Sequence, residues 1–282
     1  MVAGRLPDFV IVGATKGATT WIVENLLNQP GVFVPTQELH YFSRCFDHGT
    51  DWYLDHFRDV EAEFVGEKSA SYLPHGEAPG RLKAMLPRAR LIAQLRNPIE
   101  RAYSDYCMHF RRHQADGDIE RYLDPDHTSI PRLLYDGLYY KHLCTYLDLF
   151  DAEQIKVTIY DDLEQEPERL FRSICDHIGI RGEIDRQGLR RRAKDRAASR
   201  MPRPVRRYLA PLKRVVAPIR RTRAFQSGSA LLTRPECYPV LTDALRVRLA
   251  DYYQRDVEAL SGLLGRELGD WLAVPQRSTA SA

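Results

Sequence analysis

The sequence predicts an α/β fold: a three-layer sandwich with a central, mainly parallel β-sheet. Segments with the pattern of buried strands alternate along the chain with amphipathic, helix-like segments, which is typical of strands joined by helical crossovers. The 282 residues can bury a full core, and 44% hydrophobic with 28% charged residues is ordinary for a globular protein. We therefore expect a single domain over 1–273 and a disordered tail over 274–282.

Four strands and six helices are expected. Short apolar runs rich in β-branched or aliphatic residues predict strands over 8–13, 63–67, 90–95 and 155–160. Helix-like patterns cover 17–28, 78–86, 98–113, 139–150, 167–178 and 239–263. Pro98 and Pro167 support two helix starts, because proline is favoured in the first helical turn, and Gly179 supports a helix end.

The segment from Phe9 to Trp21 carries the most informative motif. An apolar strand ends at Gly13, a turn of small residues contains Lys16, and a helix-like pattern follows. Loop N–H groups and a helix N-terminus together bind a phosphate-like anion, and a lysine adds positive charge. The order Gly-x-x-Lys-Gly-x-Thr differs from the NTPase loop, which needs Gly-Lys-[Ser/Thr]. Taken alone, an ordinary turn with a surface lysine explains this segment about equally well.

A second motif runs from Leu91 to Tyr106. A strand ends at Arg96, Pro98 starts a helix, and Ser104 follows eight residues after the arginine. Ligands of α/β sheets bind at the carboxyl ends of the strands, and a guanidinium can hold a phosphate through two hydrogen bonds. The alternative is that Arg96 pairs with a neighbouring carboxylate while Ser104 faces solvent.

Two shorter motifs, over 37–42 and 65–72, carry titratable side chains. In an extended segment Glu38 and His40 would share one face, where they could serve as a general base and its partner. A short strand delivers Lys68 to a loop. Taken alone, these residues are more simply explained as a solvated glutamate, a half-buried histidine and an exposed lysine.

Together the four motifs resemble the heparan-sulfate-type sulfotransferases, which use 3′-phosphoadenosine 5′-phosphosulfate (PAPS). Those enzymes contain Gly-x-x-Lys-Gly-[Gly/Thr/Ala]-Thr, Glu-x-His-[Phe/Tyr]-Phe, Glu-Lys-[Ser/Thr]-x-x-Tyr and Leu-Arg-[Asn/Asp]-Pro-x-Glu-Arg-x-x-Ser-x-Tyr, and this chain has all four in that order. The resemblance covers roughly 8–180 well, 235–272 loosely and 181–235 poorly. A Lys-Gly-Arg stretch that touches the nucleotide in the animal enzymes is absent, so the adenosine-side contacts stay open.

The resemblance implies a P-loop-like 5′-phosphosulfate-binding loop and in-line sulfuryl transfer to a hydroxyl or amine. The donor-binding residues that it implies are Thr15, Lys16, Gly17, Ala18, Thr19, Thr20, Arg96 and Ser104. Of these, Arg96 and Ser104 would hold the 3′-phosphate of PAPS and of its product, PAP. Lys16 would also neutralise charge on the bridging oxygen.

The same resemblance assigns the remaining catalytic roles. Glu38 would take the proton of the acceptor, Lys68 would face the sulfuryl group or orient Glu38, and His40 would assist or position the acceptor. The acceptor would be a carbohydrate, glycolipid or secondary metabolite. No metal is required, and the sequence contains no metal-ligand spacing.

A cytoplasmic location is expected. No apolar run approaches the ~20 residues of a membrane span. The first strand begins within eight residues, which leaves no room for a secretory signal peptide. The five cysteines are widely spaced without a Cys-x-x-Cys pair, so no disulfide framework is indicated.

The net charge of +3 is unevenly distributed. Residues 181–223 hold 16 Lys and Arg against 3 Asp and Glu, which leaves 25 basic and 35 acidic residues elsewhere. The Pro-containing excursion 181–235 could be mobile without ligand. Its basic part, 186–223, could cover the nucleotide, attract an anionic acceptor, lie on an anionic membrane, or be a solvated surface.

Three other functions are weighed against sulfuryl transfer. A P-loop-type nucleoside or sugar kinase is disfavoured by the position of Lys16 and by the lack of an evident magnesium carboxylate. A nucleic-acid-binding protein would depend on 186–223 alone, without a recognition motif, so no nucleic-acid partner is expected. A relative that binds PAP without catalysis is disfavoured because every motif residue is present.

Overall fold

The computed structural model of the chain describes residues 5–181, 189 and 237–273. One compact unit is formed by Met1–Ala193 with Val240–Ala282, and the second unit, Lys194–Pro239, contributes only 237–239 to the described residues. The predicted tail 274–282, and the excursion 181–235 apart from Arg181 and Leu189, lie outside these ranges. The single-domain boundary at 273 therefore stays a prediction.

The described residues contain one sheet of five strands, all parallel, in the order β2-β3-β1-β4-β5. The strands are β1 (Phe9–Gly13), β2 (Val32–Phe33), β3 (Phe64–Lys68), β4 (Arg90–Leu95) and β5 (Ile155–Ile159). In the register, Ile11 of β1 aligns with Lys68 on one side and Ile92 on the other. The predicted parallel α/β fold is confirmed, and β2 was missed because two residues carry no readable pattern.

Ten helices are described, and the six predicted ones are found within a few residues of their expected ends. They are α1 (Thr19–Leu26), α2 (Thr50–Asp55), α3 (Ala78–Met85), α4 (Pro98–Arg111), α5 (Glu120–Leu123), α6 (Arg132–Tyr135), α7 (Tyr139–Leu147), α8 (Tyr160–Gln165), α9 (Pro167–Ile178) and α14 (Asp243–Leu264). The helices α2, α5, α6 and α8 were not predicted, because four to six residues are too few to establish a helical period.

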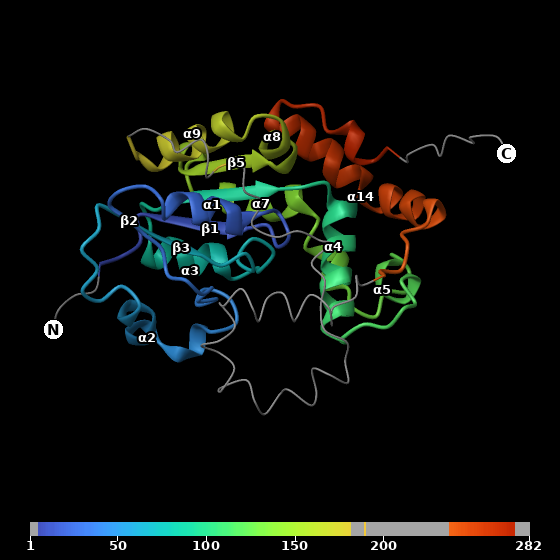
Figure 1. Ribbon diagram of the computed structural model, residues 1–282, viewed down its shortest axis with the longest axis horizontal. Helices are drawn as coiled ribbons and strands as arrows, with labels where there is room; N and C mark the ends of the chain where they lie inside the picture. Colours follow the sequence, from blue (N-terminus) through green and yellow to red (C-terminus); the bar gives the residue numbers. More distant parts are fainter. Residues whose placement is uncertain (1–4, 182–188, 190–236, 274–282) are drawn as a thin grey trace, which may run out of the picture. The chain divides into compact units, whose positions relative to one another are not determined.

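Both faces of the sheet are covered by helices (Figure 1). Side chains alternate along β1, so that Phe9 and Ile11 pack with apolar residues of α1 and α9, whereas Val10 and Val12 pack with those of α3, α7 and α14. The alternation explains why β1 is apolar at every position, as expected for a strand buried on both faces. The predicted three-layer arrangement is confirmed.

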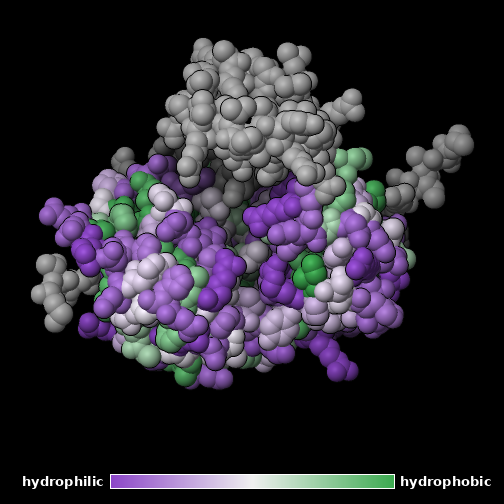
Figure 2. Space-filling model, turned by 90° about the horizontal axis from the view of Figure 1, so that it is seen from below, coloured by the Kyte–Doolittle hydropathy of each residue, from purple (hydrophilic) through white to green (hydrophobic). Residues whose placement is uncertain are grey.

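Three further findings concern the described residues. No helix among them is long and apolar enough to cross a membrane. They contain no group of His, Cys, Asp and Glu side chains able to hold a metal ion. On the face shown in Figure 2, hydrophilic residues predominate and hydrophobic residues are scattered among them.

Candidate active site

The loop after β1 folds tightly against β4. The N–H of Ala14 donates to the carbonyl oxygen of Gln94 at 2.9 Å, and the N–H of Gly17 donates to that of Ala14 at 3.0 Å. A Cβ on Gly17 would lie 2.2 Å from the carbonyl oxygen of Gln94, so only glycine fits this close approach. The loop after β1 therefore packs against Gln94 of β4, which lies two residues before Arg96.

The conformation of this loop leaves the N-terminus of α1 without a side-chain cap, which favours binding of an anion there. Lys16 and Ala18 adopt left-handed backbone conformations, with φ of 68° and 71°. Ala18 is the N-cap of α1, and no side chain accepts a hydrogen bond from the first-turn N–H groups at this cap. Such N–H groups and the positive end of the helix favour a bound phosphate or sulfate group. Thr19 is buried at this end, and Thr20 is half-buried.

Lys16 lies between the loop and α4. Its Nζ is 3.7 Å from Sδ of Met108. Ser104 is half-buried on α4, and four residues before Met108 it lies on the same helix face, the one turned toward the loop. The structure thereby brings the predicted Lys16 and Ser104 to the same side of α4.

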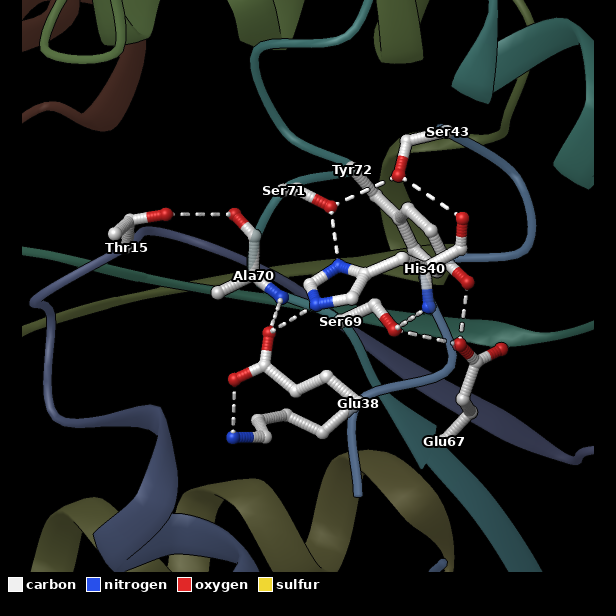
Figure 3. Close-up of polar contacts among 10 residues, drawn as sticks. Thr15, Glu38, His40, Ser43, Glu67, Ser69, Ala70, Ser71 and Tyr72 are labelled. Carbon is white, nitrogen blue, oxygen red and sulfur yellow. Dashed lines mark hydrogen bonds and ion pairs between the residues drawn. The ribbon is translucent and has the colours of Figure 1, made fainter. Parts of the chain in front are cut away.

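Glu38, Lys68 and His40 form a contact group, in which Figure 3 shows Glu38 and His40 facing each other. Nζ of Lys68 donates to Oε1 of Glu38 at 2.7 Å, and the N–H of Ala70 donates to Oε2 at 3.1 Å. Nε2 of His40 lies 3.7 Å from the same Oε2. The hydroxyl of Thr15 donates to the carbonyl oxygen of Ala70 at 3.3 Å, so one residue connects the loop to Glu38.

The local conformations differ from those expected. The segment 37–40 forms no strand: Gln37 lies in a bend, and His40 has a left-handed φ of 53°. Glu38 and His40 therefore meet through a bend rather than through strand alternation. Lys68 is the last residue of β3 and its side chain is only 14% exposed, which differs from the exposed lysine considered above.

The electrostatics of the group favour a charged Glu38 beside a neutral His40. Burial raises the pKa of Glu38, but the charge and hydrogen bond of Lys68, with help from Ala70 and His40, bring that pKa below its ordinary value. Burial and the charge of Arg44 lower the pKa of His40, and Lys68 adds to this effect against the opposing charge of Glu38. The carboxylate can thus accept a proton at neutral pH.

A second carboxylate is linked to this group through Ser69 and was missed in the sequence. Glu67 is fully buried and accepts hydrogen bonds from the hydroxyls of Tyr53 at 2.7 Å, Ser69 at 2.8 Å and Tyr72. One signal was available, because Glu67 shares a strand face with the buried Val65. Tyr72 belongs to the same short motif, five residues after Glu67, whereas Tyr53 comes from α2, and no local pattern reveals that contact.

Arg96 occupies a separate position at the end of β4. Its guanidinium lies 4.6 Å from the ring centroid of Tyr160 and 3.9 Å from Oε2 of Glu100, and its side chain is 11% exposed. The pairing with a neighbouring carboxylate, considered above as the alternative, is therefore present but too long for a hydrogen bond. Among the described residues, neither Arg96 nor Ser104 forms a hydrogen bond or ion pair with Glu38, Lys68 or His40.

Known sulfotransferases resemble this chain in both sequence and fold. Residues 53–183 match the model of the sulfotransferase family. The crystal structure of a sulfotransferase from Alicyclobacillus acidocaldarius superposes with a TM-score of 0.69 at 22% identity, covering 95% of this chain and 100% of that one. At this identity the likeness shows a shared fold.

Curated proteins similar to this chain include heparan sulfate enzymes. The chain is 31% identical over 186 residues to heparan sulfate glucosamine 3-O-sulfotransferase 3A1 of Mus musculus, which covers 63% of this chain and 47% of that protein. It is 28% identical over 197 residues to bifunctional heparan sulfate N-deacetylase/N-sulfotransferase 4 of Mus musculus, covering 62% and 22% respectively. The chain spans about half the length of the first relative. The resemblance inferred from the four motifs is confirmed.

Proposed function

We propose that this protein transfers a sulfuryl group from PAPS to a hydroxyl or amine of its acceptor, with Glu38 as the general base. The observation that carries the proposal is the 2.7 Å pairing of Glu38 with Lys68, next to the loop after β1. Sulfuryl transfer needs a base for the acceptor proton and positive charge for the developing negative charge. The similarity to sulfotransferases supports the same reaction.

The chain's residues fit the donor at two places. The loop with Lys16 and the uncapped N–H groups of α1 would hold the 5′-phosphosulfate. Arg96, whose guanidinium lies over the ring of Tyr160, and Ser104 would hold the 3′-phosphate of PAPS and of PAP. When bound, PAPS supplies an activated sulfuryl group, and Lys16 would stabilise negative charge on the bridging oxygen.

The acceptor would react at the group formed by Glu38, Lys68 and His40. Glu38 removes the acceptor proton while the new bond to sulfur forms and the bond from sulfur to the nucleotide oxygen breaks. Lys68 holds the Glu38 carboxylate in place and supplies positive charge close to it. The low pKa of Glu38 keeps this residue ionised before the acceptor binds.

We propose a glycan or small molecule as the acceptor: a carbohydrate, a glycolipid or a secondary metabolite. The curated relatives carry heparan sulfate in their names, which supports a sugar hydroxyl or amine. Contact of 186–223 with an anionic membrane or acceptor stays a prediction, because all of this segment except Leu189 lies outside the described residues. The cytoplasmic location also stays a prediction.

Thermal unfolding with and without PAP tests the proposal most directly. A ligand at 100-fold its Kd adds roughly 2.7 kcal/mol of stability, which gives a clear shift in Tm. We expect PAP to stabilise the protein, and ATP with Mg²⁺ to have no comparable effect. Stabilisation by ATP with Mg²⁺ but not by PAP would instead support the kinase. A screen of acceptors with labelled PAPS would then identify the substrate.

A further inference from the structure

Two chains of hydrogen-bonded hydroxyl groups contact His40, one at its backbone N–H and one at its ring. Its backbone N–H donates to Oγ of Ser69 at 2.9 Å, and Ser69 donates in turn to Glu67 at 2.8 Å. Its ring atom Nδ1 lies 2.7 Å from Oγ of Ser71, which lies 2.9 Å from Oγ of Ser43. Figure 3 shows both chains, with the other ring nitrogen turned toward Glu38.

In the second chain, the donor of each hydrogen bond can be assigned because the chain ends on a carbonyl oxygen. Oγ of Ser43 is 3.1 Å from the carbonyl oxygen of His40, which can only accept a hydrogen bond. Ser43 therefore uses its one proton there. Between the two serines Ser71 must then be the donor, so its own proton is also used.

These donor assignments determine which ring nitrogen of His40 carries a hydrogen. With its proton used, Ser71 can only accept from Nδ1, so Nδ1 of His40 carries a hydrogen. A neutral imidazole has one N–H, and Nε2 is then bare. That bare nitrogen is the atom 3.7 Å from Oε2 of Glu38.

We propose that Ser43 and Ser71 fix the neutral tautomer of His40, so that its bare Nε2 accepts the proton that Glu38 has removed from the acceptor. This inference extends the proposed function. The proton leaves the Glu38 carboxyl and binds Nε2, which regenerates the carboxylate and leaves His40 as an imidazolium still donating from Nδ1 to Ser71. Ser43 and Ser71 are positioning residues that act through His40.

Three charged residues act on His40: Glu38 and Arg44 from its own loop, and Lys68 from β3. Glu38 favours the imidazolium, whereas Arg44 and Lys68 oppose it. The imidazolium is therefore formed transiently, and it returns its proton to solvent in each cycle. The bare Nε2 suits this short-lived task, because a neutral ring with Nε2–H would have no lone pair to offer Glu38.

The tautomer can be measured without donor or acceptor. Long-range ¹H–¹⁵N NMR spectra of the full chain at pH about 8, above the ordinary histidine pKa, separate protonated from bare ring nitrogens. His40→Gln identifies the signals of His40 among the nine histidines. We expect protonated Nδ1 and bare Nε2, and the opposite pattern would overturn the proposal.

Two variants test the serines. In Ser43→Ala, Ser71 loses its acceptor and can donate to Nδ1, so the Nε2–H tautomer should become populated. Ser71→Ala should have the same effect, and Ser71→Thr, which keeps a hydroxyl, should restore the wild-type pattern. An unchanged tautomer in both alanine variants would overturn the proposal. Ser173→Ala is the matched control, because its hydroxyl also donates to a carbonyl, that of Leu170, but on α9.

Kinetics separate this inference from the proposed function. If the wild-type protein shows the expected tautomer but no turnover of PAPS, the proposed function fails while the assignment of the ring proton stands. If it turns over PAPS, Ser71→Ala should lose about tenfold in kcat, a modest share of a general-base contribution, with the KM for PAPS unchanged. A kcat equal to the wild-type value would overturn the role of His40 as proton acceptor.

Discussion

Glu38 and Glu67 are two carboxylates in neighbouring places with opposite environments. Glu38 is 30% exposed and is held by an ammonium group and a backbone N–H. Glu67 is fully buried and is held by three neutral hydroxyls. Both reach His40, Glu38 at the ring and Glu67 at the backbone through Ser69.

The difference separates a reactive carboxylate from a supporting one. A cation beside Glu38 lowers its pKa despite burial, whereas burial raises the pKa of Glu67 and the hydroxyls offset only part of that rise. Partial exposure lets an acceptor reach Glu38, while Glu67 has no route to substrate. We infer that Glu67 holds the bend at His40 and that Glu38 carries the chemistry.

The largest expected effect is the loss of turnover in Glu38→Gln. The amide cannot take the acceptor proton, and general-base catalysis contributes about 10²- to 10⁴-fold, so kcat should fall by that factor. Initial rates with labelled PAPS and the acceptor found by screening measure it. PAP binding should change little.

Glu61→Gln is the matched control for that variant, because Glu61 is exposed in the segment before β3. Its kcat should equal that of the wild type. A near-normal kcat in Glu38→Gln would remove Glu38 as the base and would leave the contrast with Glu67 without a functional meaning.

The next largest effect is the loss of stability in Glu67→Ala. Three buried hydroxyls lose their acceptor, and each unsatisfied group costs about 1–3 kcal/mol, so the free energy of unfolding should fall by about 3 kcal/mol or more. Urea unfolding measures the change. Glu67→Gln keeps one acceptor oxygen and should cost less. A stable Glu67→Ala protein with normal kcat would show that Glu67 does not support the bend at His40.

A smaller effect is expected for Arg96→Ala. This variant leaves Glu38 and Glu67 unchanged, so it tests nucleotide binding separately from the two carboxylates. Loss of a charge-assisted contact to phosphate costs about 1.5–3 kcal/mol, so the Kd of PAP should rise roughly 10- to 100-fold. Calorimetric titration with PAP measures it. Arg90→Ala, at the opposite end of β4, is the control and should bind PAP normally. Unchanged PAP affinity in Arg96→Ala, with normal Tm, would show that Arg96 serves only its pairing with Glu100.

The smallest effect is a difference in the pH dependence of stability. The lowered pKa of Glu38 gives stability that is present above the ordinary value of 4.5 and is lost as pH falls through the folded pKa. The raised pKa of Glu67 gives stability that is present below 4.5 and is lost as pH rises through its folded pKa. On acidification, Glu38→Gln should therefore lose less stability than the wild type, and Glu67→Gln should lose more. Urea unfolding at several pH values tests both signs, and equal slopes would contradict them.

Much of the fold could be predicted because the sheet is parallel and buried on both faces. β1 is a continuous apolar segment, β3, β4 and β5 each contain several apolar residues, and α4 and α9 begin at prolines that mark their starts. The short helices and β2 could not be predicted, because their few turns or pairs are stabilised by packing rather than by a local period. The helix near the C-terminus begins at Asp243 rather than 239, since Thr242 caps it by accepting a hydrogen bond from Leu245.

The amino-acid sequence alone establishes the residue types, their order and the sheet edge at which they lie. A strand followed by Lys16, another ending at Lys68 and a third ending before Arg96 must bring their side chains to one edge when the strands run parallel. Which of these groups contact one another depends on how the elements pack. The pairing of Glu38 with Lys68, the hydrogen bond from His40 to Ser69 and that from Tyr53 to Glu67 join residues 30, 29 and 14 positions apart in the chain. Such contacts depend on the packing of whole elements, so local patterns do not encode them.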